Sequence, residues 1–261
     1  GITVEQMFLP AITEAERREA FEKLLVAAEY AGVPVSYIKC GDEIRDSRLR
    51  LRCLHPEENT TLADANAYSE CFYVEVFAKK MKQEAIDDRK ANDASGASAI
   101  GKISILLTGD VEGEGEQQLT QKLQALQESR SLQESRSLQE SRSLQESRSL
   151  QESQSLQESQ SLQLTRRLQE QRGQREFRVD ILKVAHHGSG YSTGTEFLAT
   201  ASPATAIISC GRNNSYGHPH VEMLQRLEDA RVPWYGTMDY GALTVTVDSH
   251  GNRLRGYLRR K

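Results

Sequence analysis

Two adjacent histidines, His186 and His187, have the side chains best suited to chemistry in this sequence. They follow a short apolar run at residues 181–185 and precede Gly188. This pattern predicts a strand of an interior sheet that ends in two imidazoles. Neutral imidazole is the commonest side-chain metal ligand, and it also transfers protons near neutral pH. The alternative is one histidine packed in the core and one exposed histidine, neither with a chemical role.

Two further predicted strands end in polar groups. Residues 103–110 form a second buried-strand pattern that ends at Asp110, and residues 206–220 form a third that runs into a loop with His218 and His220. Packing alone does not require three strands to end in groups that can bind metal or phosphate. Oxygen and nitrogen ligands of this kind suit Zn²⁺ or Mn²⁺. A carboxylate that bridges two such ions is typical of two-metal hydrolases.

The order of these blocks resembles a known family. LLTGDVEGEGEQQL is followed by DILKVAHHGSGYST and then by AIISCGRNNSYGHPH, which is similar to the metallo-β-lactamase-fold domain of ComEC-type DNA-internalisation competence proteins. The resemblance runs from residues 4–10 to a hairpin near Gly241 and covers most of the chain apart from two inserts. HHGS and GHPH together are specific, whereas TGD alone is weak. The resemblance implies an α/β fold, an αββα sandwich with two sheets inside and helices outside.

One part of the family pattern is missing. The family's domain begins with a strand and an H-x-H-x-D-H-type metal motif, and nothing here matches that motif. The first histidine is His55, which precedes Pro56 and is interpreted as an exposed loop residue rather than a ligand. The resemblance therefore predicts an N-terminally incomplete domain. The intact domain would hold two divalent ions, Zn²⁺ or Mn²⁺, and this chain would supply only part of their ligands.

The resemblance also implies roles for individual residues. Asp110 would bridge the two ions, and His186 or His187 would be a ligand. We favour His187, with His186 supporting it or contacting phosphate. Side chains alternate along an extended strand, so both can be ligands only if the backbone turns there. His218 would contact the scissile phosphate or protonate the leaving oxygen. The other candidates are Ser189 in catalysis and Gly188, Asn214, Tyr216 and His220 in substrate binding.

These roles predict phosphodiester hydrolysis in which metal ions stabilise the attacking and leaving oxygens. The family points to DNA as the substrate and to a nuclease active in DNA uptake, without a small-molecule cofactor. Its other partner would be the membrane channel of a parent protein in a bacterial cell membrane, with this domain soluble and on the outer face. One alternative is hydrolysis of another phosphodiester, such as a phosphorylcholine ester. The other is a truncated module without activity, and the isolated chain is expected to be inactive.

Composition sets the limits of these expectations. The 261 residues are 38% hydrophobic, enough for one core, and the formal net charge of −4 gives no overall attraction to nucleic acid. Four widely spaced cysteines argue against a disulfide scaffold or a zinc finger. No apolar run approaches the ~20 residues of a membrane helix, and no signal segment is visible.

Periodicity and turn residues predict the remaining elements. Three acidic residues, Glu112, Glu114 and Glu116, would open a helix and complement its dipole. A long connection at 79–102 is expected to be mobile. We predict strands at 2–10, 33–38, 49–54 and 68–77, helices at 14–31, 196–200 and 221–230, and a terminal hairpin of 242–247 and 254–258, with His250 in its turn.

A hexapeptide repeat interrupts the predicted domain. From about residue 126 the unit LQESRS recurs, and it degrades by Leu164. Six residues of α-helix turn through about 600°, so successive leucines point about 120° apart and form no apolar stripe. We therefore predict a low-complexity insert at 125–172, helical or disordered, that projects from the fold. It would separate the two parts of the hydrolase domain, 1–124 and 173–261.

Overall fold

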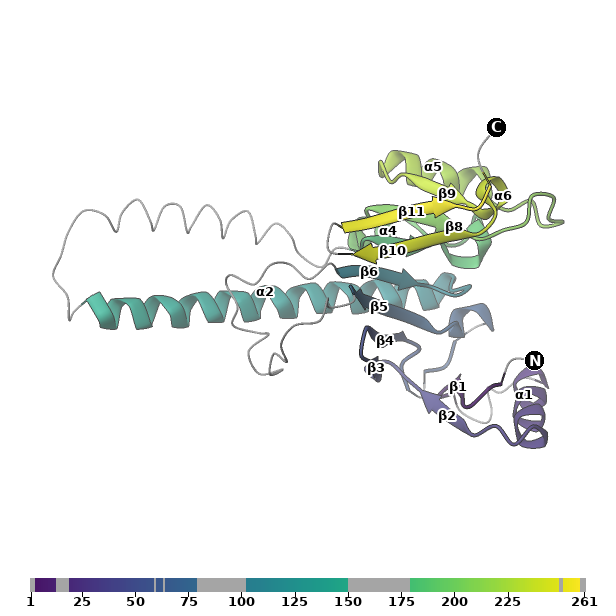
Figure 1. Cartoon of the computed structure of the whole chain (residues 1–261), viewed down its shortest axis with the longest axis horizontal. Coiled ribbons are helices and arrows are strands. Elements are labelled where there is room, and N and C mark those ends of the chain that lie inside the picture. The colour runs from purple at the N-terminus through teal and green to yellow at the C-terminus, as the bar shows by residue number, and fades with distance from the viewer. Residues whose placement is uncertain are drawn as a thin grey trace.

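The computed structural model describes residues 3–12, 19–58, 60–62, 64–78, 102–149, 179–248 and 251–258. Its centre is a seven-stranded sheet in the order β3-β4-β5-β6-β7-β8-β9 (Figure 1). Neighbouring strands are antiparallel from β3 to β6 and parallel from β6 to β9. The strands are β3 (Glu43–Asp46), β4 (Leu49–His55), β5 (Cys71–Phe77), β6 (Lys102–Leu107), β7 (Ile181–Lys183), β8 (Thr205–Ile208) and β9 (Trp234–Gly236).

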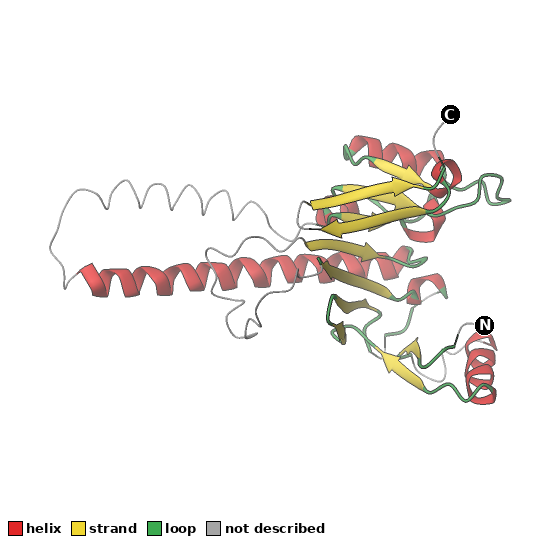
Figure 2. Ribbon diagram, in the orientation of Figure 1, coloured by secondary structure: helices red, strands yellow, loops and turns green. Residues whose placement is uncertain are grey.

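Helices cover the sheet and bury its apolar side chains (Figure 2). Phe197 of α4 (Thr195–Ala201), Leu227 of α5 (Val221–Asp229) and Leu119 of α2 (Gly113–Ser149) belong to the same core cluster as Leu106 and Leu182 of the central strands. All five side chains are almost completely buried. Burying each one contributes about 1.5–3 kcal/mol, so this core fixes the strand ends that carry the candidate site.

Two smaller sheets accompany the central one. The hairpin of β10 (Leu243–Asp248) and β11 (Gly251–Gly256) packs against β6 as a second layer. The parallel pair of β1 (Met7–Pro10) and β2 (Val35–Ile38) lies with α1 (Glu19–Tyr30) beyond the β3 edge (Figure 1). The predicted mixed α/β class is confirmed, and the layers are compatible with an α/β sandwich.

Two β-strands and one α-helix were not predicted from the sequence, and one residue was misplaced. The missed elements are β3, β9 and α6 (Thr237–Tyr240), which are all short. The prediction of an exposed loop for His55 was wrong, because this residue ends β4 opposite Cys71 and is only 1% exposed. Its Nε2–H donates to the carbonyl of Ala67 at 2.6 Å, and burial lowers its pKa. The connection at 79–101 and the turn at His250 lie outside the described residues.

The first half of the repeat insert is helical and continues α2 away from the sheet (Figure 1). Leu126 still packs against the core, and Gln127 Nε2 donates to the carbonyl of Thr200 at 2.8 Å. Leu132, one turn and a half further on, is 62% exposed. The helix therefore leaves the domain after Gln127. Residues 150–172 lie outside the described residues, so the boundaries of the insert stay a prediction. Among the described residues, no helix is both long and apolar enough to span a bilayer.

Two deletions test where the domain ends along α2. Removing residues 131–172 behind a short linker should change the free energy of unfolding by less than about 0.5 kcal/mol, because the described core contacts of α2 end at Gln127 and Leu132 is already exposed. Removing residues 125–172 should cost about 1–3 kcal/mol, because it also removes the packing of Leu126 and the hydrogen bond of Gln127. Urea unfolding followed by circular dichroism measures both changes. Equal losses in the two deletions would show that the distal repeats belong to the core.

Candidate functional site

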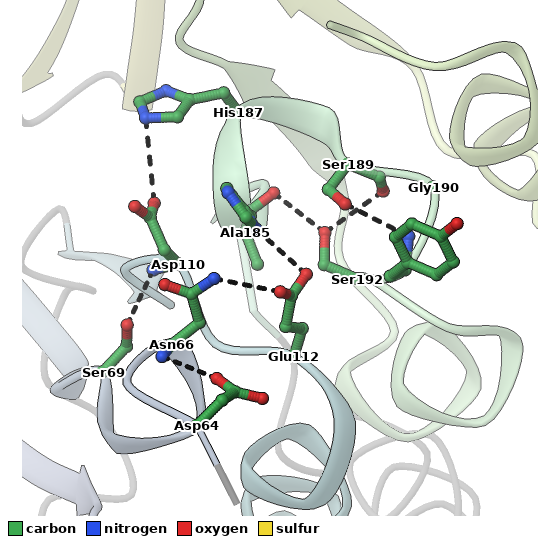
Figure 3. A network of polar contacts seen from close by, with 12 residues as sticks. Asp64, Asn66, Ser69, Asp110, Glu112, Ala185, His187, Ser189, Gly190 and Ser192 are labelled. Carbon is green, nitrogen blue, oxygen red and sulfur yellow. Dashed lines mark hydrogen bonds and ion pairs between the residues drawn. The ribbon is translucent and has the colours of Figure 1, made fainter. Parts of the chain in front are cut away.

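The carboxyl ends of β6, β7 and β8 lie side by side, and short hydrogen bonds connect the loops that follow them. The His186 N–H donates to the carbonyl of Gly109 at 3.1 Å, and the Thr108 hydroxyl donates to the carbonyl of Lys183 at 2.6 Å. Because the three strands are parallel, the residues after them meet at one edge of the sheet. Asp110 and His187 are brought together there, as the sequence predicted (Figure 3). His186 lies next to His187 in the same turn.

The chain turns sharply at the two histidines. Both residues have left-handed backbone angles, with φ of 44° at His186 and 55° at His187, inside the short turn η3 (Ala185–Gly188). A non-glycine residue in this region costs roughly 1–2 kcal/mol, and such strain is concentrated at functional sites. The turn removes the alternation of an extended strand, and the two ring centroids lie 6.4 Å apart. Both imidazoles can therefore serve the same site.

His187 directs its Nε2 toward Asp110. Its Nδ1 lies 2.6 Å from the carbonyl oxygen of Ser209, which can only accept, so Nδ1 carries the proton. Nε2 lies 3.8 Å from Oδ1 of Asp110, and in the neutral form of the ring it presents a lone pair to that oxygen. Two acceptors facing each other at this distance leave room for a cation between them. Two ligands of one ion, each about 2.1 Å from it, lie about 3.4 Å apart in tetrahedral geometry.

This pair fits two positions of a metal site but does not complete one. A catalytic zinc site has about three protein ligands plus water. Within the part of the chain that the structure describes, no group of three or more His, Cys, Asp or Glu side chains could hold an ion. His187 and Asp110 are two side chains of types that bind metal, and their role as ligands stays a prediction.

Asp110 is held by Ser69, which precedes β5, and by Lys183 of β7. Its N–H donates to Oγ of Ser69 at 3.1 Å. Nζ of Lys183 lies 4.0 Å from its Oδ1 and donates to the carbonyl of Gly109 at 2.9 Å. Burial lowers the pKa of Lys183, and the Asp110 carboxylate opposes this shift. The ammonium group of Lys183 thus offsets part of the charge of Asp110.

A chain of polar contacts orients His186. Its Nδ1 lies 2.9 Å from Oε2 of Glu112, and Nδ2 of Asn66 donates to the other oxygen of that carboxylate at 3.0 Å. Oδ1 of Asp64 accepts the Asn66 N–H at 2.7 Å. A carboxylate bound to one ring nitrogen fixes the orientation of the ring. The sequence analysis assigned Glu112 only to the helix dipole, since its spacing alone does not indicate a histidine partner.

His218 lies next to both histidines of the turn. Its ring centroid is 5.5 Å from that of His186 and 6.4 Å from that of His187. Asn214 fixes the residue from both sides, since Oδ1 accepts the His218 N–H at 2.9 Å and Nδ2 donates to the His218 carbonyl at 2.6 Å. Burial and the neighbouring histidines lower the pKa of His218, while Asp110 opposes them. The neutral ring is therefore favoured and still donates one N–H. Asn214, which was expected to bind substrate, thus holds the main chain of His218 in place.

Three other predicted site residues hold the two loops together. His220 precedes α5, accepts the Gly190 N–H on Nδ1 at 2.8 Å and donates from Nε2 to the Tyr216 carbonyl at 3.1 Å. The Ser189 hydroxyl is buried and accepts the Tyr191 N–H at 3.2 Å. Gly188 has φ of 90°, and a Cβ there would lie 2.7 Å from Cβ of Pro219. These contacts give all three residues a positioning role.

Glu70 is a buried carboxyl beside the site, and it predicts a pH dependence of stability. Its Oε1 is buried and has no hydrogen-bond partner among the described residues, and burial raises its pKa from 4.5 to about 7. A carboxyl group whose pKa is higher in the folded than in the unfolded chain stabilises the fold at pH values below its unfolded pKa. This contribution to the free energy of unfolding is lost as pH rises from about 4.5 to 7. Glu70→Gln should therefore be more stable than the parent by about 1 kcal/mol or more at pH ~8, and nearly equal at pH ~4.5. Urea unfolding at both values tests this, with exposed Glu5→Gln as control. An equal effect at both pH values would show that Glu70 does not titrate in this way.

The incomplete ligand pair predicts weak metal binding by this chain alone. We expect less than one Zn²⁺ or Mn²⁺ per chain to survive dialysis, because two ligands hold an ion weakly. Elemental analysis of the dialysed protein measures the content, and Asp110→Asn should lower it further. Two tightly held ions per chain would contradict the prediction and would require ligands that we have not identified.

Comparisons with known proteins agree with the motifs. No protein-family model matches the chain. It is 27% identical over 242 residues to ComE operon protein 3 of Bacillus subtilis. This alignment covers 91% of this chain and 21% of that protein. A stretch of 50 residues is 44% identical to Recombination protein 2 of Haemophilus influenzae, covering 19% of this chain and 6% of that protein. The chain thus spans less than a quarter of either relative. The similarity over most of the chain supports a relation to competence proteins.

Proposed function

We propose that this chain is part of a metal-dependent phosphodiesterase that cuts DNA during uptake, with Asp110 and His187 as two of its metal ligands. The observation that carries the proposal is Nε2 of His187 facing the Asp110 carboxylate at 3.8 Å, with the His218 ring beside it. The similarity to ComE operon protein 3 supports DNA uptake as the setting. In this setting the parent protein would lie in a bacterial cell membrane, with the domain on the outer face beside the channel.

Each residue of the site has a defined task in this proposal. A divalent ion, when bound, would activate water and stabilise charge on the phosphate oxygens. Asp110 and His187 would hold the ion, and the hydrogen bond from Nδ1 of His187 to the Ser209 carbonyl would keep Nε2 directed toward it. Lys183 limits the excess negative charge, so that an anionic phosphodiester can approach Asp110. His218 donates its N–H to a phosphate oxygen, which is the general kind of contact that stabilises a developing charge.

The proposal requires at least one more ligand from outside the described residues. It also explains why we expect the chain alone to be nearly inert toward DNA. The observation that only two ligands meet among the described residues favours one alternative, a module that binds DNA without cutting it. These two functions differ in what happens when the missing ligand is restored.

To test the proposal, a segment with an H-x-H-x-D-H-type strand end is fused to the N-terminus of the chain. The segment is taken from in-frame upstream coding sequence or from a relative. We expect Mn²⁺-dependent cleavage of DNA in the joined protein and almost none in the chain alone. A phosphorylcholine ester serves as the competing substrate. Hydrolysis of that ester without DNA cleavage would replace DNA as the substrate, and a joined protein that binds two ions without any hydrolysis would favour the binding module.

A further inference from the structure

Three aromatic rings form a row that begins at the candidate metal position. The His187 and His218 rings are inclined by 20° with centroids 6.4 Å apart, and the His218 and Tyr216 rings by 25° with centroids 5.8 Å apart. Both spacings are within the range of offset-stacked aromatic pairs. The row leads from the Asp110 carboxylate to Tyr216, one ring beyond the residue that we place on the phosphate.

Tyr216 is both exposed and fixed in place. Its side chain is 77% exposed, although its ring stacks on His218. Its carbonyl accepts a hydrogen bond from His220, and Asn214 closes the same loop through the His218 main chain. An exposed aromatic ring that the fold holds in one orientation beside a polar site offers a binding face at little entropic cost.

A cavity of about 350 Å³ opens beside this row. This volume is within the usual range for small-molecule sites, and it accommodates a nucleoside. None of its lining residues is acidic, so the charge of a phosphate is not opposed at its walls. The cavity is lined by His187, Ser209, Cys210, Gly211, Asn214, Tyr216, His218 and Thr237.

We infer that Tyr216 is a stacking platform for a base of single-stranded DNA, adjacent to the phosphodiester held at the histidines. The inference rests on the proposed function, since it places the base relative to that phosphate. A base in a duplex stacks on its neighbours and pairs with a base of the opposite strand. Only an unpaired base can therefore lie on the Tyr216 ring without the cost of opening the duplex. The site therefore selects single strands over duplexes, although the chain has no overall positive charge.

Binding of labelled DNA by the whole chain tests the inference without requiring cleavage. Fluorescence anisotropy, without added metal, compares an oligothymidylate with a blunt duplex of equal length. We expect tighter binding of the single strand. Tyr216→Ala should weaken it roughly tenfold, the order of one base–aromatic stack, and should leave duplex binding unchanged. Tyr216→Phe should retain the affinity because it keeps the ring. Tyr30→Ala, at the 96% exposed tyrosine of α1, is the matched control and should have no effect.

The possible results separate this inference from the proposed function. Equal single-strand affinity in the parent and Tyr216→Ala, or no binding of the single strand at all, would overturn the inference and leave the nuclease proposal standing. Tyr216-dependent binding that persists in Asp110→Ala supports the inference independently of catalysis. If the joined protein then failed to cut DNA, the nuclease proposal would fall while the stacking site remained.

Discussion

Replacing Asp110 with alanine should reduce DNA cleavage by the joined protein by roughly a thousandfold or more, and should remove most of its bound metal. The carboxylate faces Nε2 of His187 at 3.8 Å, and in the proposed function it would take the bridging position. Loss of a bridging ligand disturbs both ions of a two-metal site at once, and with them the stabilisation of attacking and leaving oxygens. The measurement is the initial cleavage rate together with metal content by elemental analysis.

Two further variants make the Asp110 result specific. Asp110→Asn retains the shape of the side chain, and its main-chain bond to Ser69 is unchanged, so lost activity in this variant reflects the charge. Asp46→Ala, on the edge strand β3, removes an exposed carboxylate elsewhere and should leave the rate unchanged. Full activity of Asp110→Ala would end the two-metal interpretation.

His218→Ala should lower the cleavage rate of the joined protein by roughly 10²–10³-fold while its metal content stays intact. The residue is placed on the substrate and not on the ions, and Asn214 holds it at the rings of His186 and His187. A positioned group of this kind typically contributes 10²–10⁴-fold to rate. The lowered pKa of His218 adds a pH criterion, because its neutral form should persist below the usual titration range of histidine. Activity should therefore hold as pH falls through about 6.5.

The control for this variant is His218→Gln, which keeps a donor and should retain more activity than alanine. Loss of metal in His218→Ala would instead make His218 a ligand. If His218→Ala changed neither the cleavage rate nor the metal content, His218 would have only a structural role in its loop.

The sequence predicted the part of the site that depends on buried parallel strands. The runs before Asp110, His186 and Ser209 are mostly apolar, with Ser104 and Lys183 as polar interruptions, as expected for strands covered on both faces, and such strands end at a common edge. The sequence showed only that both histidines can be ligands if the backbone turns between them. It could not predict the left-handed turn itself, because the side-chain pattern of a strand does not determine the backbone angles at its end. The structure satisfies that condition.

Other features depend on contacts between distant segments and left little trace in the local pattern. His55 is buried because η2 (Asn66–Tyr68) lies against the end of β4, and the sequence shows only a histidine before a proline. The partner of Glu112 is 74 residues away in the chain. The repeat differs from these residues, because its helix does not depend on contacts with distant segments. Its leucine spacing predicts no apolar stripe. Its helical form follows from extending a helix that buried residues such as Leu119 and Leu123 already stabilise.

The central claim is that Asp110 and His187 together hold a divalent ion, and Mn²⁺ titration of this chain followed by histidine ring NMR signals tests it most directly. Paramagnetic broadening reports even weak binding, so the missing ligands do not prevent the measurement. We predict that small amounts of Mn²⁺ broaden the His187 signals before those of the other five histidines, and that Asp110→Asn abolishes this selectivity. Broadening that spares His187, or that is the same in Asp110→Asn, would contradict the account.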